Sequence, residues 1–176
     1  MRKAEINPMP EFFDRYINLM DDVDLFDALA EFTPDHIFSD IDKLVKLGDK
    51  VYQPGKWTVS DILQHVIDNE RIMAYRALRF SRNDKTILPG YDEELLAANT
   101  NASAIGLEQL MEEFRLVRAS TIAMYRGMSN TMLLRSGLAY KSEISALALG
   151  FVILGHPVHH MRVIEERYFS LLADTF

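Results

Sequence analysis

The stretch ISALALGFVILGHPVHHMRV, Ile144 to Val163, joins the longest apolar run of the chain to three of its five histidines. The apolar run is too short to cross a bilayer by itself and is typical of a buried helix. On a helix His156 and His160 lie on one face, roughly 6 Å apart along the axis. The same face carries Leu149 and Ile153, so the histidines continue an apolar stripe. The stretch therefore predicts imidazoles inside a helical core.

The rest of the chain repeats the helical spacing of apolar residues, which predicts an all-α protein. Residues 129–141 form the one stretch with β-like character. Four amphipathic helices with long inter-helix loops predict a four-helix bundle. We expect a single domain over residues 1–176, with residues 1–20 partly peripheral. The expected helices cover residues 21–47, 58–82, 106–128 and 142–172.

Local signals predict where several of these helices begin. Thr33 followed by Pro34 has the pattern of an N-cap and a first helical position, so the first helix restarts or kinks there. Thr58 and Asp61 form a capping-box pattern at the start of the second helix. Ser142 is the expected N-cap of the last helix.

Composition excludes several classes of function. The net charge of −7 disfavours a nucleic-acid partner and an anionic membrane surface, because both need a basic face. The chain has no cysteine, and hence no disulfide, thiolate metal ligand or catalytic thiol. The N-terminus lacks the apolar core of a signal peptide. We expect a cytoplasmic protein.

A buried imidazole needs partners for its ring nitrogens, and a metal ion is one solution. His156 can pair with His160 or with His159, and spacing alone leaves this choice open. His65, on the second helix, is the best candidate for a third ligand, with Asp61 and Asp68 near enough in sequence to hold its free nitrogen. The alternative is that these histidines are hydrogen-bonded structural residues. The remaining histidine, His36, is expected on the surface.

Three segments, in this order and spacing, resemble the DinB/YfiT-like superfamily of metal-binding four-helix bundles. They are Tyr52–Asp84, with His65 near its middle, the loop LPGYDE at Leu88–Glu93, and Leu154–Tyr168, which closes the chain with its histidines. The resemblance implies that His65, His156 and His160 bind a divalent transition metal, with zinc or nickel favoured, and that His159 does not. Pro157 departs from the family pattern. A proline inside a helix predicts a kink and a free carbonyl at Ile153.

The resemblance also implies an activity. Family members of known activity are S-transferases and isomerases that use a low-molecular-weight thiol such as bacillithiol, mycothiol or glutathione. Three neutral imidazoles leave at least one coordination position open on the metal. We therefore expect a metal-dependent thiol S-transferase acting on a small-molecule substrate. The alternatives are a metal-dependent hydrolase that uses the same site, and a non-catalytic metal- or small-molecule-binding protein of a stress response.

Such chemistry benefits from a proton acceptor near the metal. Glu70 and Asp92 lie in the family-like segments and are the candidate catalytic acids or bases. The simpler readings are an ion pair for Glu70 and a helix cap for Asp92. A basic strip on the second helix would suit a substrate carboxylate or phosphate, although a solvated helix face is the favoured reading. Its members are Arg76, Arg79 and Arg82.

The last helix is also apolar on the side opposite the histidines. A helix that is apolar on both sides lies either at the centre of a core or at an interface. We expect a homodimer, and the alternative is that the bundle itself wraps this helix. The stripe consists of Leu147, Phe151, Leu154, Val158 and Met161.

Overall fold

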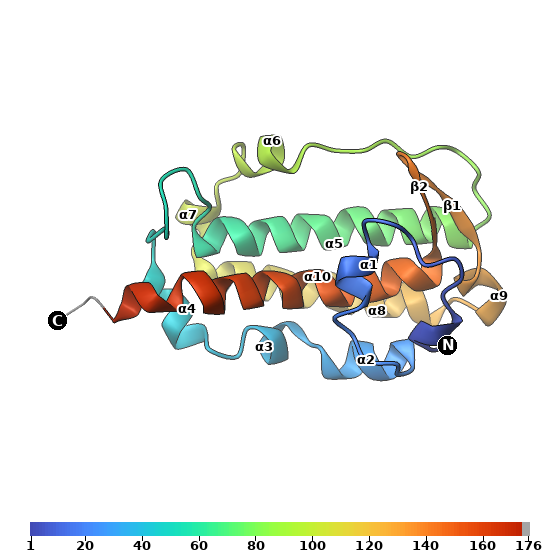
Figure 1. Cartoon of the computed structure of the whole chain (residues 1–176), viewed down its shortest axis with the longest axis horizontal. Helices are drawn as coiled ribbons and strands as arrows, with labels where there is room; N and C mark the ends of the chain where they lie inside the picture. The colour runs from blue at the N-terminus through green and yellow to red at the C-terminus, as the bar shows by residue number, and fades with distance from the viewer. Residues whose placement is uncertain (174–176) are drawn as a thin grey trace.

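The computed structural model describes residues 1–173, and its architecture is a helical bundle, as predicted. Three long helices lie side by side, and a row of short helices takes the place of a fourth (Figure 1). The long helices are α5 (Val59–Ser81), α8 (Leu107–Arg126) and α10 (Ala146–Arg167), and the short row is α2 (Leu25–Glu31), α3 (Pro34–Ile37) and α4 (Ile41–Leu47). The last long helix, α10, has its most extensive contacts with the first long helix, α5.

Shorter elements connect and flank the bundle. A two-stranded antiparallel sheet joins β1 to β2, with Ser136 opposite Ser145 and Ala139 opposite Ser142. It accounts for the β-like character expected just before the last helix. The remaining elements are η1 (Lys3–Glu5), α1 (Asp14–Ile17), α6 (Glu93–Ala97), α7 (Ala102–Ile105), α9 (Asn130–Leu133), β1 (Ser136–Ala139), β2 (Ser142–Ser145) and η2 (Phe169–Leu172).

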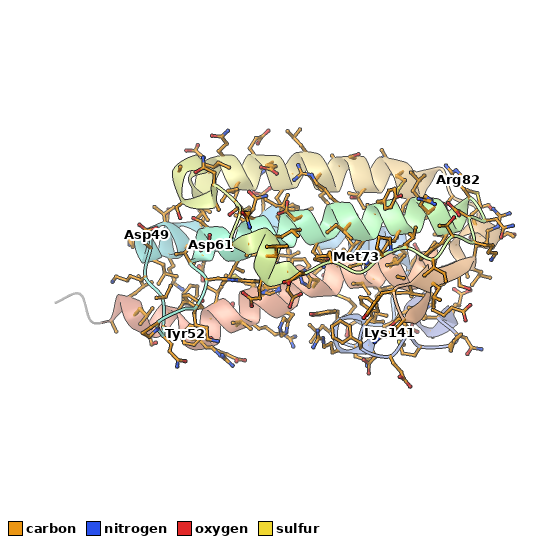
Figure 2. All side chains as sticks on the ribbon, turned by 90° about the horizontal axis from the view of Figure 1, so that it is seen from above. Asp49, Tyr52, Asp61, Met73, Arg82 and Lys141 are labelled. Atoms are coloured by element: carbon orange, nitrogen blue, oxygen red, sulfur yellow. The ribbon has the colours of Figure 1, made fainter. Side chains whose placement is uncertain are left out.

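The predicted helix starts are confirmed at two positions. Thr58 Oγ1 accepts a hydrogen bond from the Asp61 N–H at 3.2 Å, and Asp61 Oδ2 accepts one from the Thr58 N–H at 2.9 Å. This is a complete capping box. Thr33 caps α3, with Pro34 in its first turn. Figure 2 shows α5 running from Asp61 past Met73 to Arg82.

The last helix begins and ends elsewhere than predicted. Ser142 is not its N-cap, because residues 142–145 pair with β1 and remain extended. Ser145 takes that role and accepts a hydrogen bond from the Ala148 N–H at 3.1 Å. The α-helix ends at Arg167, and a 3-10 turn follows up to Leu172.

Helix α10 is the core of the bundle. By length and apolar composition it could cross a membrane, but 72% of its apolar window is buried inside the protein. The stripe opposite the histidines is covered by the protein's own helices, since Leu147, Phe151 and Leu154 are fully buried. The homodimer therefore stays a prediction, without support from an exposed stripe.

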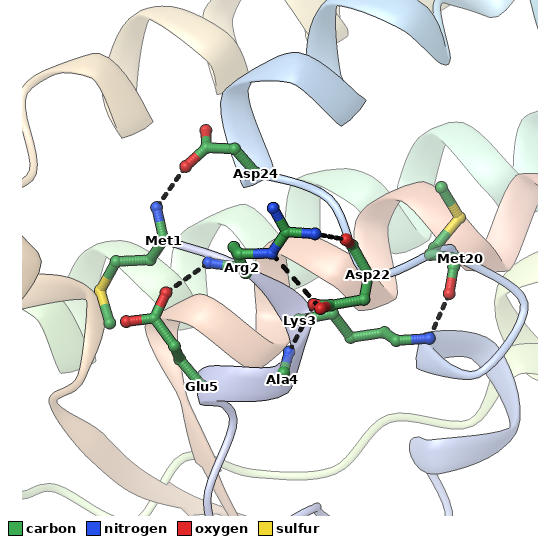
Figure 3. Close-up of polar contacts among 8 residues, drawn as sticks. All are labelled: Met1, Arg2, Lys3, Ala4, Glu5, Met20, Asp22 and Asp24. Carbon is green, nitrogen blue, oxygen red and sulfur yellow. Dashed lines mark hydrogen bonds and ion pairs between the residues drawn. The ribbon is translucent and has the colours of Figure 1, made fainter.

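The N-terminal segment is fastened to the bundle at two places. The Met1 ammonium pairs with Asp24 at 2.5 Å, and Arg2 and Lys3 bond to the stretch before α2 (Figure 3). Further along, α1 lies against α10 where Gly155 faces the backbone of Tyr16. A Cβ at Gly155 would stand 2.0 Å from the Tyr16 carbonyl oxygen, so this close approach requires glycine.

Candidate metal centre

The structure brings His65, His156 and His160 together. His65 projects from α5, and the other two project from successive turns of α10. His156 Nε2 lies 3.1 Å from the Nε2 of His65 and 3.1 Å from that of His160. One ligand atom from each of the three lies within 4.8 Å of the others. The predicted cluster is thus present, and it excludes His159.

The spacing of the ring nitrogens fits a metal ion. Imidazole nitrogens bind zinc at about 2.0–2.1 Å, so two of them at a tetrahedral angle are about 3.3 Å apart. The two nitrogen pairs measured here are close to that separation. Neutral imidazole suits zinc, nickel, iron and copper, so the ligand set leaves the identity of the metal open.

The electrostatics of the cluster favour neutral rings. Burial lowers the pKa of His65 to about 4 and that of His160 to about 3. Burial, reinforced by the neighbouring histidines, holds the pKa of His156 well below its ordinary value. A neutral imidazole has a free lone pair, which is the form that binds a metal.

Aromatic rings surround the cluster. The Trp57 ring lies 4.8 Å from that of His65, and the Tyr16 ring lies 5.0 Å from that of His156, both measured between centroids. His159 packs edge-on against Tyr16 at 5.5 Å, so it contributes to the packing of the site. His36 is exposed, as expected.

The two aspartates expected to hold the free nitrogen of His65 have other partners. Asp61 belongs to the capping box with Thr58. Asp68 accepts a hydrogen bond from Gln64 at 3.0 Å. His65 is on the same helix, but both carboxylates bond to other residues at that helix, so sequence proximity to His65 was a poor guide to contact.

Glu70 lies in a buried ion pair that braces the bundle. The Arg118 guanidinium donates to both of its carboxylate oxygens at 2.8–3.1 Å, and both side chains are 2% exposed. Arg118 also donates to the Phe32 carbonyl at 2.5 Å and to the Ile153 carbonyl at 3.4 Å. The Ile153 carbonyl is the one that Pro157 leaves free, and α10 continues through the proline without interruption. The predicted kink stays a prediction, while the free carbonyl has a donor.

In the loop LPGYDE, the acid that lines a cleft beside the histidines is Glu93, whereas the predicted Asp92 caps a helix. Asp92 caps α6 by accepting a hydrogen bond from the Leu95 N–H at 3.0 Å. The next residue, Glu93, lines two clefts that also contain histidines of the cluster. An aspartate before two glutamates is a helix-cap pattern, and this signal could have directed attention from Asp92 to its neighbour. The catalytic roles of Glu70 and Asp92 stay predictions.

Two clefts reach the cluster from different sides. The first, here called the Arg76 cleft, has a volume of about 380 Å³ and is lined by Tyr16, Arg76, Glu93 and His156 among others. The second, the Trp57 cleft, has about 370 Å³ and is lined by Trp57, Glu93 and His160 among others. A larger hollow of about 820 Å³ lies beside α4 and α8, and no histidine lines it. The chemistry of the cluster therefore belongs to the two smaller clefts.

The basic strip does not behave as one surface. Arg79 is partly exposed and paired with Asp84, and Arg82 is exposed, as expected for a solvated face. Arg76 contradicts that reading, because it is only 5% exposed and lines the cleft beside His156. Arg76 lies on the same inward side of α5 as Met73 and Ala77, which are both buried.

Comparison with known proteins places this arrangement in a family. The family model described as the DinB superfamily matches residues 19–164. The chain belongs to the DinB superfamily. A solved structure with a similar fold is YfiT from Bacillus subtilis, with a TM-score of 0.64 and 17% identity over 92% of this chain and 88% of that one. That protein is described as a probable metal-dependent hydrolase with an unusual four-helix bundle topology. No curated protein matched the sequence.

Membership of the DinB superfamily separates two parts of the site. All three clustered histidines lie within the residues that the family model matches. The Arg76 cleft is also lined by three residues that precede the matched range, Phe12, Phe13 and Tyr16. In this DinB-superfamily chain the cluster thus belongs to the shared bundle, and one wall of the cleft comes from the segment that precedes it.

Proposed function

We propose that the protein is a metal-dependent thiol S-transferase whose divalent metal is held by His65, His156 and His160. The observation that carries this proposal is the convergence of three neutral ring nitrogens, one at each of the two clefts and one from the facing helix. When bound, the metal would lower the pKa of a small thiol or of water at its open position. Zinc and nickel are the favoured ions.

The two clefts support transfer between two organic molecules. A hydrolase needs room for one organic substrate and a water molecule, whereas an S-transferase must hold a thiol and an electrophile together. Clefts of about 380 and 370 Å³ that meet at one cluster suit the second requirement. In the proposed reaction the thiol loses its proton, its sulfur forms a bond to an electrophilic carbon, and the leaving group departs with the electron pair.

Glu93 is the carboxylate best placed to accept the thiol proton. It lines both clefts, so its carboxylate is available to a proton released within either of them. Glu70 and Asp92 are weaker candidates for this role. Arg118 binds both carboxylate oxygens of Glu70, and Asp92 Oδ1 accepts a hydrogen bond from the α6 backbone. Tyr16 and Trp57 limit access of water to the rings that they cover.

A metal-dependent hydrolase is the second candidate, favoured by the description of YfiT. It would use the same three histidines, with water in place of the thiol. A non-catalytic metal- or small-molecule-binding protein is the third. The cytoplasmic location and the homodimer are proposed with the same standing.

The first experiment tests the metal site. Purified wild type, His160→Ala and His36→Ala are analysed for bound metal by mass spectrometry. We expect stoichiometric metal in wild type and in His36→Ala, whose histidine is exposed, and its loss in His160→Ala. Equal metal content in all three proteins, or none in wild type after metal supplementation, would overturn the proposed site.

The second experiment separates the candidate functions. The wild-type protein is loaded with Co²⁺, and its visible spectrum is recorded with and without a low-molecular-weight thiol. A thiol transferase predicts a new sulfur-to-metal charge-transfer band. An unchanged spectrum, combined with hydrolysis of ester or amide substrates, would favour the hydrolase. An unchanged spectrum without turnover would favour the binding protein.

A further inference from the structure

Arg76 is a buried cation without an anionic partner. Its guanidinium donates to the Pro89 carbonyl at 3.0 Å and contacts the Met73 sulfur at 3.6 Å. No carboxylate within residues 1–173 lies at ion-pair distance from it. Burying a charge is unfavourable unless the charge is paired, so an unpaired arginine at 5% exposure needs an explanation. A ligand that brings its own anion supplies one.

The surroundings of Arg76 have the composition of a ligand site. Its guanidinium carbon lies 5.7 Å from the centre of the Tyr91 ring, and Tyr91 lines the same cleft. Pockets for small molecules are mostly apolar, with a few polar groups that fix orientation. The apolar wall of the cleft is made by Phe13, Tyr16, Met73 and Val152.

Asn69 supplies a second polar group that lacks a partner. Its amide nitrogen donates to the Tyr91 hydroxyl at 2.7 Å, but its Oδ1 is buried and has no hydrogen bond within the described residues. Asn69 is only 7% exposed and lines the Arg76 cleft. An unsatisfied buried acceptor is unfavourable, and a ligand donor can satisfy it. Arg76 and Asn69 are seven residues apart on α5 and lie on one face of the helix.

We propose that the Arg76 cleft binds a small, largely apolar or aromatic monocarboxylate, with its carboxylate on Arg76, any hydrogen-bond donor that it carries at Asn69 Oδ1, and its other end toward His156. The planar guanidinium matches a carboxylate through two parallel hydrogen bonds. Glu93 lines the same cleft, and its negative charge disfavours a dianion such as a phosphate ester. The volume of about 380 Å³ accommodates a single substituted ring.

This assignment rests on the proposed function only in naming the monocarboxylate as the electrophilic substrate of the S-transferase. The binding itself requires no metal, because Arg76 is not a member of the histidine cluster. Binding is therefore measured on chelator-treated protein, where a carboxylate cannot coordinate a metal. Failure of the metal site then leaves the binding result unaffected, and failure of binding leaves the metal site unaffected.

The experiment is calorimetric titration of metal-free protein with cinnamate, cinnamamide and phenyl phosphate. We expect cinnamate to bind at least tenfold more tightly than the other two. Arg76→Gln should lose that preference, and Arg76→Lys should recover part of the affinity, because it restores the charge without the fork. Arg79→Gln is the matched control on the same helix and should bind cinnamate as wild type does.

Three results would overturn the proposal. One is equal binding of cinnamate and cinnamamide by wild type, or no binding of either. The second is unchanged cinnamate affinity in Arg76→Gln, with circular dichroism confirming that the variant is folded. The third is tighter binding of phenyl phosphate than of cinnamate, which would assign the cleft to a phosphate.

Discussion

Arg118 and Arg76 are both arginines buried in the bundle, yet their surroundings are opposite. Arg118, at 2% exposure, has a bidentate carboxylate partner and donates to two backbone carbonyls. Arg76, at 5% exposure, donates to one backbone carbonyl, and no carboxylate within residues 1–173 pairs with it. The fold itself supplies the carboxylate that pairs with Arg118. For Arg76 we infer that a ligand supplies it. Two arginines of nearly equal burial can therefore have different roles. The one with a carboxylate partner stabilises the fold, and the one without is a candidate binding residue.

The largest effect on stability is expected when Arg118, which braces the bundle through Glu70, is replaced. Arg118→Met strands the Glu70 carboxylate and leaves the Phe32 and Ile153 carbonyls without this donor. Removing one partner of a buried ion pair costs about 3–5 kcal/mol, and each unsatisfied carbonyl adds about 1–3. We expect the free energy of unfolding, measured by urea denaturation, to fall by about 5 kcal/mol or more. A loss below about 1 kcal/mol would contradict the role of the brace.

Removing only the charge of Glu70 gives a smaller effect. Glu70→Gln keeps an acceptor oxygen for Arg118, and the guanidinium keeps its two backbone carbonyls. We expect a loss of about 3 kcal/mol in the same denaturation assay. The difference between the two variants measures the share of the backbone contacts. If Glu70→Gln lowered the free energy of unfolding more than Arg118→Met does, the ion pair alone would account for the stabilisation by Arg118.

Acidification tests the burial of the histidine cluster. The unfolded chain binds protons at histidine below about pH 6.5, whereas folding lowers the pKa of His65 to about 4 and that of His160 to about 3. The unfolded state therefore holds more protons between about pH 6.5 and 4. We expect metal-free protein to lose stability as pH falls through that window, by up to about 1.4 kcal/mol per pH unit for each extra proton. Urea denaturation at several pH values checks this, and His65→Asn should flatten the dependence.

The smallest effect is expected at the unpaired arginine. Arg76→Met removes an unfavourable buried charge at the expense of one hydrogen bond, so stability should change by about 1 kcal/mol or less, in either direction. Ligand binding should nevertheless be lost. Arg79→Gln, in a partly exposed ion pair with Asp84, is the control for both measurements. A loss above about 2 kcal/mol for Arg76→Met would make Arg76 a second brace and erase the comparison.

Much of the fold follows from local chemistry. The capping box at Thr58 and the Thr33-Pro34 start are confirmed because both depend on a few adjacent residues. Ser142 was the wrong cap because a serine can also pair in a strand, and the partner strand is decided by tertiary contacts. The fourth position of the bundle is divided into three short helices. The Thr33-Pro34 signal predicts the break between α2 and α3, whereas the apolar spacing does not reveal the one between α3 and α4.

The site divides in the same way. The spacing of His156 and His160 places them on one face, and the helical pattern already made His65 the best third candidate. Only the family resemblance selected His160 over His159. Arg118 was missed, although it lies four residues after Phe114 and three before Thr121, both buried. An arginine in phase with a buried stripe indicates a facing carboxylate, but which carboxylate depends on how helices pack. The same limit applies to Arg76, whose lack of a carboxylate partner within residues 1–173 is visible only in three dimensions.

The N-terminal segment has one more consequence. Its contact at Gly155 holds Tyr16 against the cleft, while the clustered histidines and Arg76 are all carried by α5 and α10. Substitutions at Phe12 or Phe13 can therefore reshape the wall without moving the histidines. This wall of the Arg76 cleft can thus vary independently of the histidine cluster, because the two are carried by different segments of the chain.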